Sequence, residues 1–249
     1  MELPQFSFMS NSTTLYTSES IAELDDACWH KNVYSRLDAT LRSPHMLFPC
    51  PYGVAGHKRG HIRFGFCEAM SAPRIAECLN LFLPKCREFG EFTSLVIFEK
   101  PAKVESMEYY HRKFWRILND LADLDPFPWP TDIPREIDHK SWEFCFRGEP
   151  IFALGTTPSH VLRKSRRSSS FTMTFQPRWV FDKVLDTPEN AAKVFSLVKE
   201  RLDKFDLVEK SPFLGKYGEE TTREAKQYFI ADDNTELACP FEQLGKKRG

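Results

Sequence analysis

Two closely spaced runs in the middle of the chain, SWEFCFR at residues 141–147 and PIFALG at residues 150–155, decide the fold. They are separated only by Gly148 and Glu149, and a two-residue gap that contains glycine is typical of a β-hairpin. A third strand-like run, SSFTMTF at residues 169–175, follows without a long helical crossover. Because parallel neighbours need such a crossover, these runs predict antiparallel pairing.

The flanking sequence supplies two more strands and about five helices. Strands are expected at residues 61–68, as a half-buried strand, and at 93–99. Helices are expected at residues 20–42, 73–89, 104–122, 178–185 and 188–205, whereas the prolines around 47–53 and 125–130 predict extended or turn backbone and 210–249 shows little periodicity. The sequence therefore predicts an α+β fold, a single domain with a mostly antiparallel or mixed sheet of about five strands covered by helices.

Composition narrows the class of protein. The 249 residues hold 34 Lys+Arg against 35 Asp+Glu, which argues against a nucleic-acid partner bound by bulk charge. No apolar run reaches the roughly 18 residues of a membrane span. The seven cysteines show no CxxC, and the N-terminus lacks a signal peptide, so we expect a cytoplasmic protein without disulfides. We expect one domain over residues 20–242, a flexible N-terminal segment 1–19 and a basic flexible tail 243–249, and the sequence leaves the oligomeric state open.

The chain carries few familiar catalytic motifs. It has no GxSxG, HExxH, GxGxxG or GxxxxGK[ST], so hydrolase, metalloprotease, dinucleotide and P-loop functions lose their usual support. Cys50, His57 and His61 are residue types that bind zinc, but no fourth ligand follows at a familiar spacing. A proline-rich turn with surface histidines explains the same residues.

A basic cluster is the stronger signal. Four cations, Arg163, Lys164, Arg166 and Arg167, follow His160 between two predicted strands. Such a cluster binds phosphate, carboxylate or a pair of propionates, although a solvated surface would look the same. The 22 Phe, 5 Trp and 7 Tyr suit either an apolar cofactor pocket or a plain core.

Several stretches taken together resemble a known family. They are Phe48-Pro49-Cys50, Arg63-Phe64, Trp142-Glu143-Phe144 with Gly148-Glu149-Pro150, Pro158-Ser159-His160 with Arg163, Ser165 and Arg166, Phe175-Gln176-Pro177-Arg178 with Val180-Phe181, and Lys226-Gln227-Tyr228-Phe229 with Cys239-Pro240-Phe241. In these residues, from about 40 to 242, the chain is similar to the YqcI/YcgG family of FPC-motif proteins. Members with assigned roles are heme proteins that hydroxylate nitrogen, in the guanitoxin and D-cycloserine pathways.

The resemblance implies a heme-dependent monooxygenase. By this likeness the chain would bind heme b and use O2 to N-hydroxylate a small substrate that carries a guanidine or amine. Since the sequence has no flavin or nicotinamide fingerprint, an external electron donor, a separate redox partner, is implied. Two alternatives stay open: a heme-binding or heme-sensing protein without turnover, and a non-heme anion-binding domain.

The resemblance also suggests residue roles. His160 is the first choice of axial iron ligand and Cys50 the second, with His57, His61 and His111 as further histidines. Phe48 and Trp142 would line the heme slot, and Arg163 and Arg166 would reach the propionates. Arg178 would bind a propionate or a substrate carboxylate, or brace a helix start. Glu143 and Glu149 are the carboxylates that would face a guanidinium substrate. The alternative is that they are ordinary solvated side chains of a strand and a turn.

Overall fold

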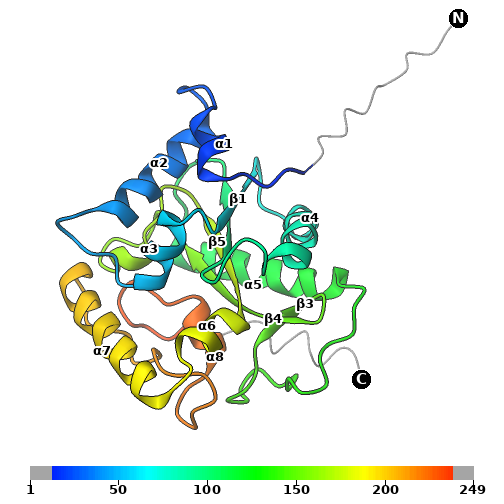
Figure 1. Ribbon diagram of the computed structural model, residues 1–249, viewed down its shortest axis with the longest axis vertical. Coiled ribbons are helices and arrows are strands. Elements are labelled where there is room, and N and C mark those ends of the chain that lie inside the picture. Colours follow the sequence, from blue (N-terminus) through cyan, green and yellow to red (C-terminus); the bar gives the residue numbers. More distant parts are fainter. Residues whose placement is uncertain (1–12, 238–249) are drawn as a thin grey trace, which may run out of the picture.

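The computed structural model describes residues 13–237, in which one five-stranded mixed sheet organises the chain (Figure 1). Its strands are β1 (Ile62–Cys67), β2 (Ser94–Glu99), β3 (Phe144–Phe146), β4 (Glu149–Thr156) and β5 (Thr172–Pro177), in the order β1-β2-β5-β4-β3. The β1–β2 pair is parallel, and the other three pairs are antiparallel. The predicted α+β fold with a mixed sheet is confirmed.

Helices precede, separate and follow the strands. They are α1 (Ser18–Ala22), α2 (Trp29–Arg42), α3 (Pro51–Lys58), α4 (Ala72–Phe82), α5 (Met107–Leu124), α6 (Arg178–Val184), α7 (Pro188–Phe205) and α8 (Glu224–Tyr228), with short 3-10 turns at Leu83–Lys85 and Lys164–Arg166. Within residues 13–237, no helix is both long and apolar enough to cross a lipid bilayer.

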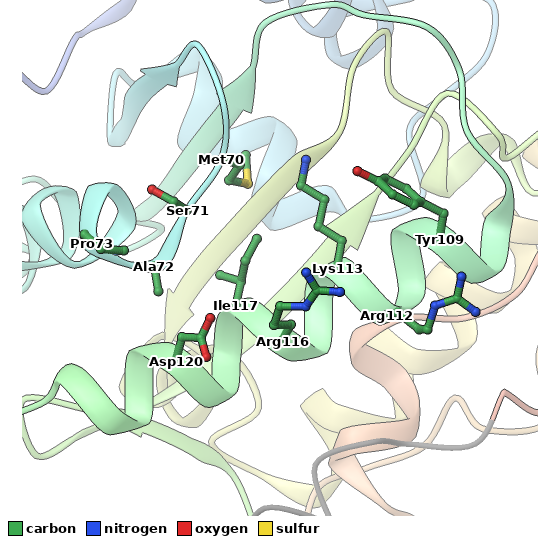
Figure 2. Close-up of a pocket in the computed structure, with 10 residues that line it drawn as sticks. All are labelled: Met70, Ser71, Ala72, Pro73, Tyr109, Arg112, Lys113, Arg116, Ile117 and Asp120. Atoms are coloured by element: carbon green, nitrogen blue, oxygen red, sulfur yellow. The ribbon is translucent and has the colours of Figure 1, made fainter.

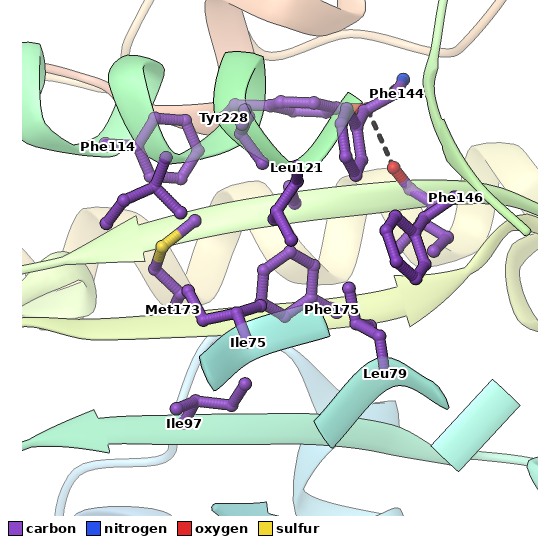
Figure 3. Close-up of a cluster of buried hydrophobic side chains, with 14 of the residues drawn as sticks. Ile75, Leu79, Ile97, Phe114, Leu121, Phe144, Phe146, Met173, Phe175 and Tyr228 are labelled. Atoms are coloured by element: carbon purple, nitrogen blue, oxygen red, sulfur yellow. Dashed lines mark hydrogen bonds between the residues drawn. The ribbon is translucent and has the colours of Figure 1, made fainter. Parts of the chain in front are cut away.

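The main core lies between one sheet face and the helices α4, α5 and α8 (Figure 3). Strand side chains at alternate positions point into it, including Ile97, Phe144 and Phe175, and all three are fully buried. Phe114 of α5 and Tyr228 of α8 pack into the same cluster. The short helix α8 is therefore part of the hydrophobic core.

A second core covers the opposite face of β1 and β2. There Phe98 stacks with Phe64 and Phe66, and the three rings share a buried cluster with side chains of α1 and α2 such as Ile21 and Val33. The strand predicted at residues 61–68 is confirmed as β1, but the expectation that it is half-buried is wrong, because helices cover both of its faces. The polar-looking alternate positions hold Gly65 and Cys67, which are small enough to face the main core.

Local chemistry explains where the other predictions miss. The predicted helix 20–42 is two helices, and Asp25 interrupts it by accepting the Ala27 N–H in a turn. The expected extended stretch around 47–53 instead starts α3, since Pro51 occupies a first-turn position and the Cys50 side chain caps the helix. The hairpin turn is Arg147–Gly148 rather than Gly148–Glu149, and both turn residues have positive φ, 54° and 71°.

The proposed domain limits are only partly covered. Of the N-terminal segment 1–19, residues 13–19 are described, and Tyr16 there exchanges two backbone hydrogen bonds with Phe64 of β1. This part of the segment is therefore joined to the edge of the sheet. The tail 243–249 lies outside the described residues.

The close approach of α3 to the loop before β2 gives a stability test. A Cβ on Gly56 would lie 2.4 Å from the backbone oxygen of Phe92, whereas one on Gly53 of the same helix would meet nothing closer than 3.6 Å. We expect Gly56→Ala to lower the free energy of unfolding by about 1–3 kcal/mol because backbone must move. Gly53→Ala, the matched control, should be neutral or stabilise by up to about 1 kcal/mol. Equal urea midpoints for the two variants would contradict this packing.

Candidate functional site

Most of the predicted site residues fall into two polar clusters, and the chain around α8 runs between them. The first cluster surrounds Arg178, at the start of α6. The second surrounds the loop between β4 and β5, residues 157–171, together with the N-terminus of α3. Gln227 of α8 joins the two: its side-chain amide donates to Glu224 at 3.3 Å, and its backbone oxygen accepts from Arg166 at 3.3 Å.

In the first cluster Arg178 binds two carboxylates at once. Its Nε and Nη2 donate to the two oxygens of Glu143, both at 2.6 Å, and Nη2 also donates to Glu224 at 2.7 Å. The side chains of Glu143 and Glu224 are 0% and 5% exposed. We call Glu143, Arg178 and Glu224 the Arg178 triad. Glu143 was expected to face the guanidinium of a substrate, and in the structure it pairs with a guanidinium of the protein itself.

Burial dominates the ionisation of the triad. It raises the pKa of Glu143 to about 8, although the charge and hydrogen bonds of Arg178 act in the opposite direction. Burial also raises the pKa of Glu224. For Arg178 burial would lower the pKa, but the two carboxylates outweigh it and the net shift is upward. With two carboxylates and one guanidinium, the triad has a surplus negative charge and retains a proton above the usual carboxyl range.

Aromatic side chains enclose the triad. The Arg178 guanidinium lies 3.9 Å from the ring centre of Tyr217. Tyr228 donates its hydroxyl hydrogen to the backbone oxygen of Ile151 at 2.9 Å, and its oxygen accepts the Phe144 N–H at 3.1 Å. Trp142 is fully buried and packs against Tyr228, with ring centres 5.7 Å apart. The triad thus ties α6 and α8 to β3.

In the second cluster Asp232 organises the loop that begins at Thr157. Its carboxylate accepts the backbone N–H groups of Val161, Leu162 and Arg163 at 2.7–3.0 Å. Although burial acts upward, these three donors hold the pKa of Asp232 below its usual value. The loop is therefore fixed from the C-terminal side of the chain, by a residue 69–71 positions away.

His160 is fully buried, and both of its ring nitrogens are hydrogen-bonded. Nδ1 pairs with the Thr157 hydroxyl at 2.9 Å, and Nε2 pairs with the backbone oxygen of Ile230 at 2.9 Å. Because the carbonyl can only accept, Nε2 carries the hydrogen and Nδ1 accepts from Thr157. Burial lowers the pKa of His160 to about 4. In this arrangement His160 is a neutral residue that braces the loop.

The two loop arginines differ in how far the protein satisfies them. Arg163 is 1% exposed, donates from Nε to the backbone oxygen of Ala231 at 2.8 Å and also bonds to Asn234. Arg166 donates to the backbone oxygen of Gln227, and the rest of its guanidinium has no described hydrogen-bond partner among residues 13–237. Burial lowers the pKa of Arg166 to about 10. Arg166 therefore keeps donors for an anion.

Cys50 lies on the side of this cluster formed by α3. Its Sγ accepts the Gly53 N–H at 3.3 Å as the cap of the helix. Burial raises the pKa of the thiol, while the positive charges of Arg201 and Arg166 act in the opposite direction. Phe48 packs edge-on against Phe205, and its backbone oxygen accepts from Arg201 at 3.1 Å. The structure thus brings the Phe-Pro-Cys motif within electrostatic reach of Arg166.

Other predicted residues lie apart from these clusters. Glu149 binds Arg87 at 3.2–3.4 Å on the exposed start of β4. His57 bonds through Nε2 to Asp38 at 2.6 Å, and His111 accepts the indole N–H of Trp115. The Cys–His–His zinc pattern is not assembled: within residues 13–237 no three side chains of metal-ligating type come together.

Sequence reasoning missed the acidic partners. Glu224 and Asp206 are nearly fully buried, and Asp206 accepts from the backbone N–H of Ser165 at 2.6 Å and from its hydroxyl at 2.8 Å. Asp232 was missed too. One indication in the sequence points to this part of the chain. The Lys226–Phe229 block, one of the stretches that resemble the family, lies in a tail that otherwise shows little periodicity. Nothing in the sequence connects these acids to particular cations.

The Arg178 triad predicts a pH-dependent stability. A carboxyl whose pKa is raised on folding stabilises the fold at low pH, and that contribution is lost as pH rises toward the folded pKa, about 8 for Glu143. Glu224→Gln keeps the shape of the side chain and the acceptor for Arg178 but removes the surplus charge. We expect wild type to lose stability relative to this variant between pH 5 and pH 8, by at most about 1.4 kcal/mol per pH unit. Urea unfolding at both pH values measures this, and a constant difference between the two proteins would contradict it.

Comparison with known proteins identifies a matching family and several similar proteins. The model of the YqcI/YcgG family matches residues 37–242. Uncharacterized protein YcgG of Bacillus subtilis (strain 168) is 36% identical over 241 residues, covering 92% of this chain and 95% of that protein. Uncharacterized protein YqcI of the same strain is 35% identical over 243 residues, covering 93% and 96%.

A more distant relative has a name that states an activity. It is the "Putative N(omega)-hydroxy-L-arginine synthase DcsA" of Streptomyces lavendulae, 27% identical over 253 residues that cover 97% of this chain and 94% of that protein. No solved structure matches the chain. The family match over most of the chain and the two relatives above 30% identity agree with the motifs quoted from the sequence: this protein belongs to the YqcI/YcgG family.

Proposed function

We propose that this protein N-hydroxylates a nitrogen of a small, arginine-like substrate. The observation that carries the proposal is the relationship to DcsA, which extends over nearly the full length of both chains. Placing a hydroxyl on nitrogen with O2 inserts one oxygen atom into an N–H bond. The other oxygen leaves as water, so each turnover consumes two electrons and two protons. An external electron-donor protein would supply the electrons.

Heme b is the cofactor we propose for this chemistry, and Cys50 is the residue whose surroundings best fit its iron. The Cys50 sulfur accepts a backbone N–H at the start of α3 and is exposed to the charges of Arg166 and Arg201. Burial raises the pKa of this thiol overall, and the N–H donor and the two cations act against that rise, which favours the thiolate, the form that binds iron. When bound, a thiolate-ligated heme would supply the activation of O2.

His160 suits this role less well than its position in the sequence suggested. Both ring nitrogens already bond to the protein, and the ring is fully buried. Binding iron would break the bond between Nε2 and Ile230 or the one between Nδ1 and Thr157. We therefore assign His160 the task of holding the β4–β5 loop, on which Arg166 lies.

The arginines divide in the same way. Arg178 and Arg163 already have carboxylate, amide or carbonyl partners, so recruiting either for a ligand would leave buried acceptors unpaired. Arg166 retains donors near Cys50 and is our choice for a heme propionate or a substrate carboxylate. Phe48, beside Cys50 in sequence, would contribute apolar surface.

Turnover is the direct test of the activity. Full-length protein loaded with heme should convert L-arginine, or a related guanidine, to its N-hydroxy product, with O2 and an external reductant both required. Product mass that includes one atom from labelled O2 is the measurement. Bound heme without product from a panel of guanidines and amines would favour the sensing alternative, and failure to bind heme would favour the anion-binding one.

The ligand assignment has its own test. Cys50→Ser should remove the spectroscopic signature of a thiolate ligand and shift the reduced carbonyl band to shorter wavelength. His160→Gln, which keeps hydrogen-bonding capacity, should retain that signature and lower stability by about 1–3 kcal/mol through the weakened loop. Loss of the iron signature in His160→Gln but not in Cys50→Ser would reverse the assignment.

A further inference from the structure

Three exposed apolar residues come together where the β4–β5 loop meets the end of α7. Val161 and Leu162 of the loop are 55% and 39% exposed, and Leu207, which follows α7, is 64% exposed. The backbone N–H of Leu207 donates to the backbone oxygen of Leu162 at 2.7 Å, which joins the two segments. We call Val161, Leu162 and Leu207 the Leu207 patch.

Hydrogen bonds hold the backbone of this patch in place. Asp232 accepts the backbone N–H groups of Val161 and Leu162, and Asp206, at the end of α7, accepts the N–H and the hydroxyl of Ser165. The loop would have to break bonds to these two carboxylates before it could turn its apolar side chains inward. Neighbouring apolar side chains that a fixed backbone presents to water are typical of a surface that another protein covers.

The charge beside the patch is positive. The backbone oxygen of Leu162 also accepts the N–H of Lys164 at 3.1 Å, which places this lysine next to the patch. Neither Lys164 nor Arg167, farther along the loop, has an ion pair among residues 13–237. The two acids that anchor the loop are occupied by its own donors. A partner with acidic side chains would therefore supply counter-charges that this surface lacks.

The groove between α4 and α5 is a contrasting surface (Figure 2). Met70, Ala72 and Ile117 of its lining are buried, so they offer a protein partner little apolar surface. Figure 2 shows Arg116 and Asp120 on either side of Ile117, so a cation and an acid share its rim. This region therefore provides control residues for a test of the Leu207 patch.

We propose that the Leu207 patch, together with Lys164 and Arg167, is the docking surface for an acidic one-electron carrier protein. This inference rests on the proposed function, which requires electrons from an external donor. The loop of the patch also carries Arg166, whose charge reaches Cys50, so a docked donor would lie beside the cluster proposed to hold heme.

The size and chemistry of the surface suit such a carrier. Electron-transfer partners bind each other weakly through small interfaces, and an apolar centre with a charged rim is a common arrangement. Each encounter would oxidise one carrier by one electron and reduce the bound heme by one electron. Two encounters would supply the two electrons that one turnover consumes.

Binding is measured by calorimetry at low salt, with full-length protein, with and without heme, and oxidised plant-type ferredoxin, a small acidic [2Fe–2S] protein. Lys164→Glu should weaken binding about tenfold or more, because it replaces an attraction with a repulsion. Leu207→Ser should weaken binding about threefold or more, because it removes apolar contact. Added salt should weaken binding as well.

Two variants on the α4–α5 side of the molecule are the matched controls. Arg116→Glu changes an exposed arginine without an ion pair among residues 13–237, and Leu81→Ser changes a leucine that is 45% exposed. Both should leave the affinity for ferredoxin unchanged.

Electron delivery gives a second readout. Reduced ferredoxin should reduce the bound heme about tenfold more slowly in Lys164→Glu than in the wild type. Dithionite, a small reductant that needs no docking surface, should reduce both proteins at similar rates.

The outcomes separate this inference from the proposed function. Equal ferredoxin affinity in Lys164→Glu, Leu207→Ser and the controls would overturn the docking surface, as would equally tight binding of the basic protein cytochrome c. Product formation with a chemical reductant, in a protein that binds neither ferredoxin nor flavodoxin, would overturn it and leave the proposed function intact. Ferredoxin binding that both variants weaken, in a chain that takes up no heme, would support the surface while the proposed function fails.

Discussion

The guanidinium of Arg178 is the group on which much of this structure depends. It pairs with both Glu143 beside β3 and Glu224 in α8, two acids 81 positions apart that are both buried. Removing it would leave two buried carboxylates without a counter-charge, a change that typically costs about 3–5 kcal/mol. Because α8 is docked through this contact, Tyr228 can fill the main core, and the chain that follows is aligned with the β4–β5 loop.

The chain after α8 also positions the residues of the second cluster. Beyond Tyr228, three successive residues, Ile230, Ala231 and Asp232, supply acceptors to His160, Arg163 and the loop backbone. The loop in turn presents Arg166 toward Cys50 at the start of α3. Most of the polar residues that look catalytic in the sequence are therefore used to hold the fold together. The ones that keep capacity for a ligand, Arg166 and Cys50, are those that the rest positions.

The sequence predicts the sheet well because its strands are short, alternating and bounded by turns. The runs at 93–99 and 169–175 and the hairpin near Gly148 are all present, displaced by one to three residues. It fails where tertiary contacts override local pattern: Pro51 starts a helix that Cys50 caps, and α8 exists because the core accepts Tyr228. The site is harder to predict than the fold. Glu143 and Glu224, like Arg163 and Asp232, are so far apart along the chain that no sequence spacing indicates their contact. By residue type alone, Arg163, Arg166 and Arg178 are equally good candidates for binding an anion. Only their hydrogen-bond partners in the structure show that Arg166 keeps free donors.

Arg166 and the exposed Arg116 of α5 are two arginines without an ion pair among residues 13–237, and they stand in different surroundings. Arg166 is surrounded by protein closely enough that burial lowers its pKa to about 10, and a cation in such a place is stabilised by an anion that stays bound. Arg116 is exposed on α5, where water satisfies it at little cost. An anion beside Arg116 therefore gains little binding free energy from the charge alone, which is typical of a ligand that exchanges with solution. The electrostatics therefore favour a tightly held anion beside Arg166 more than beside the exposed Arg116.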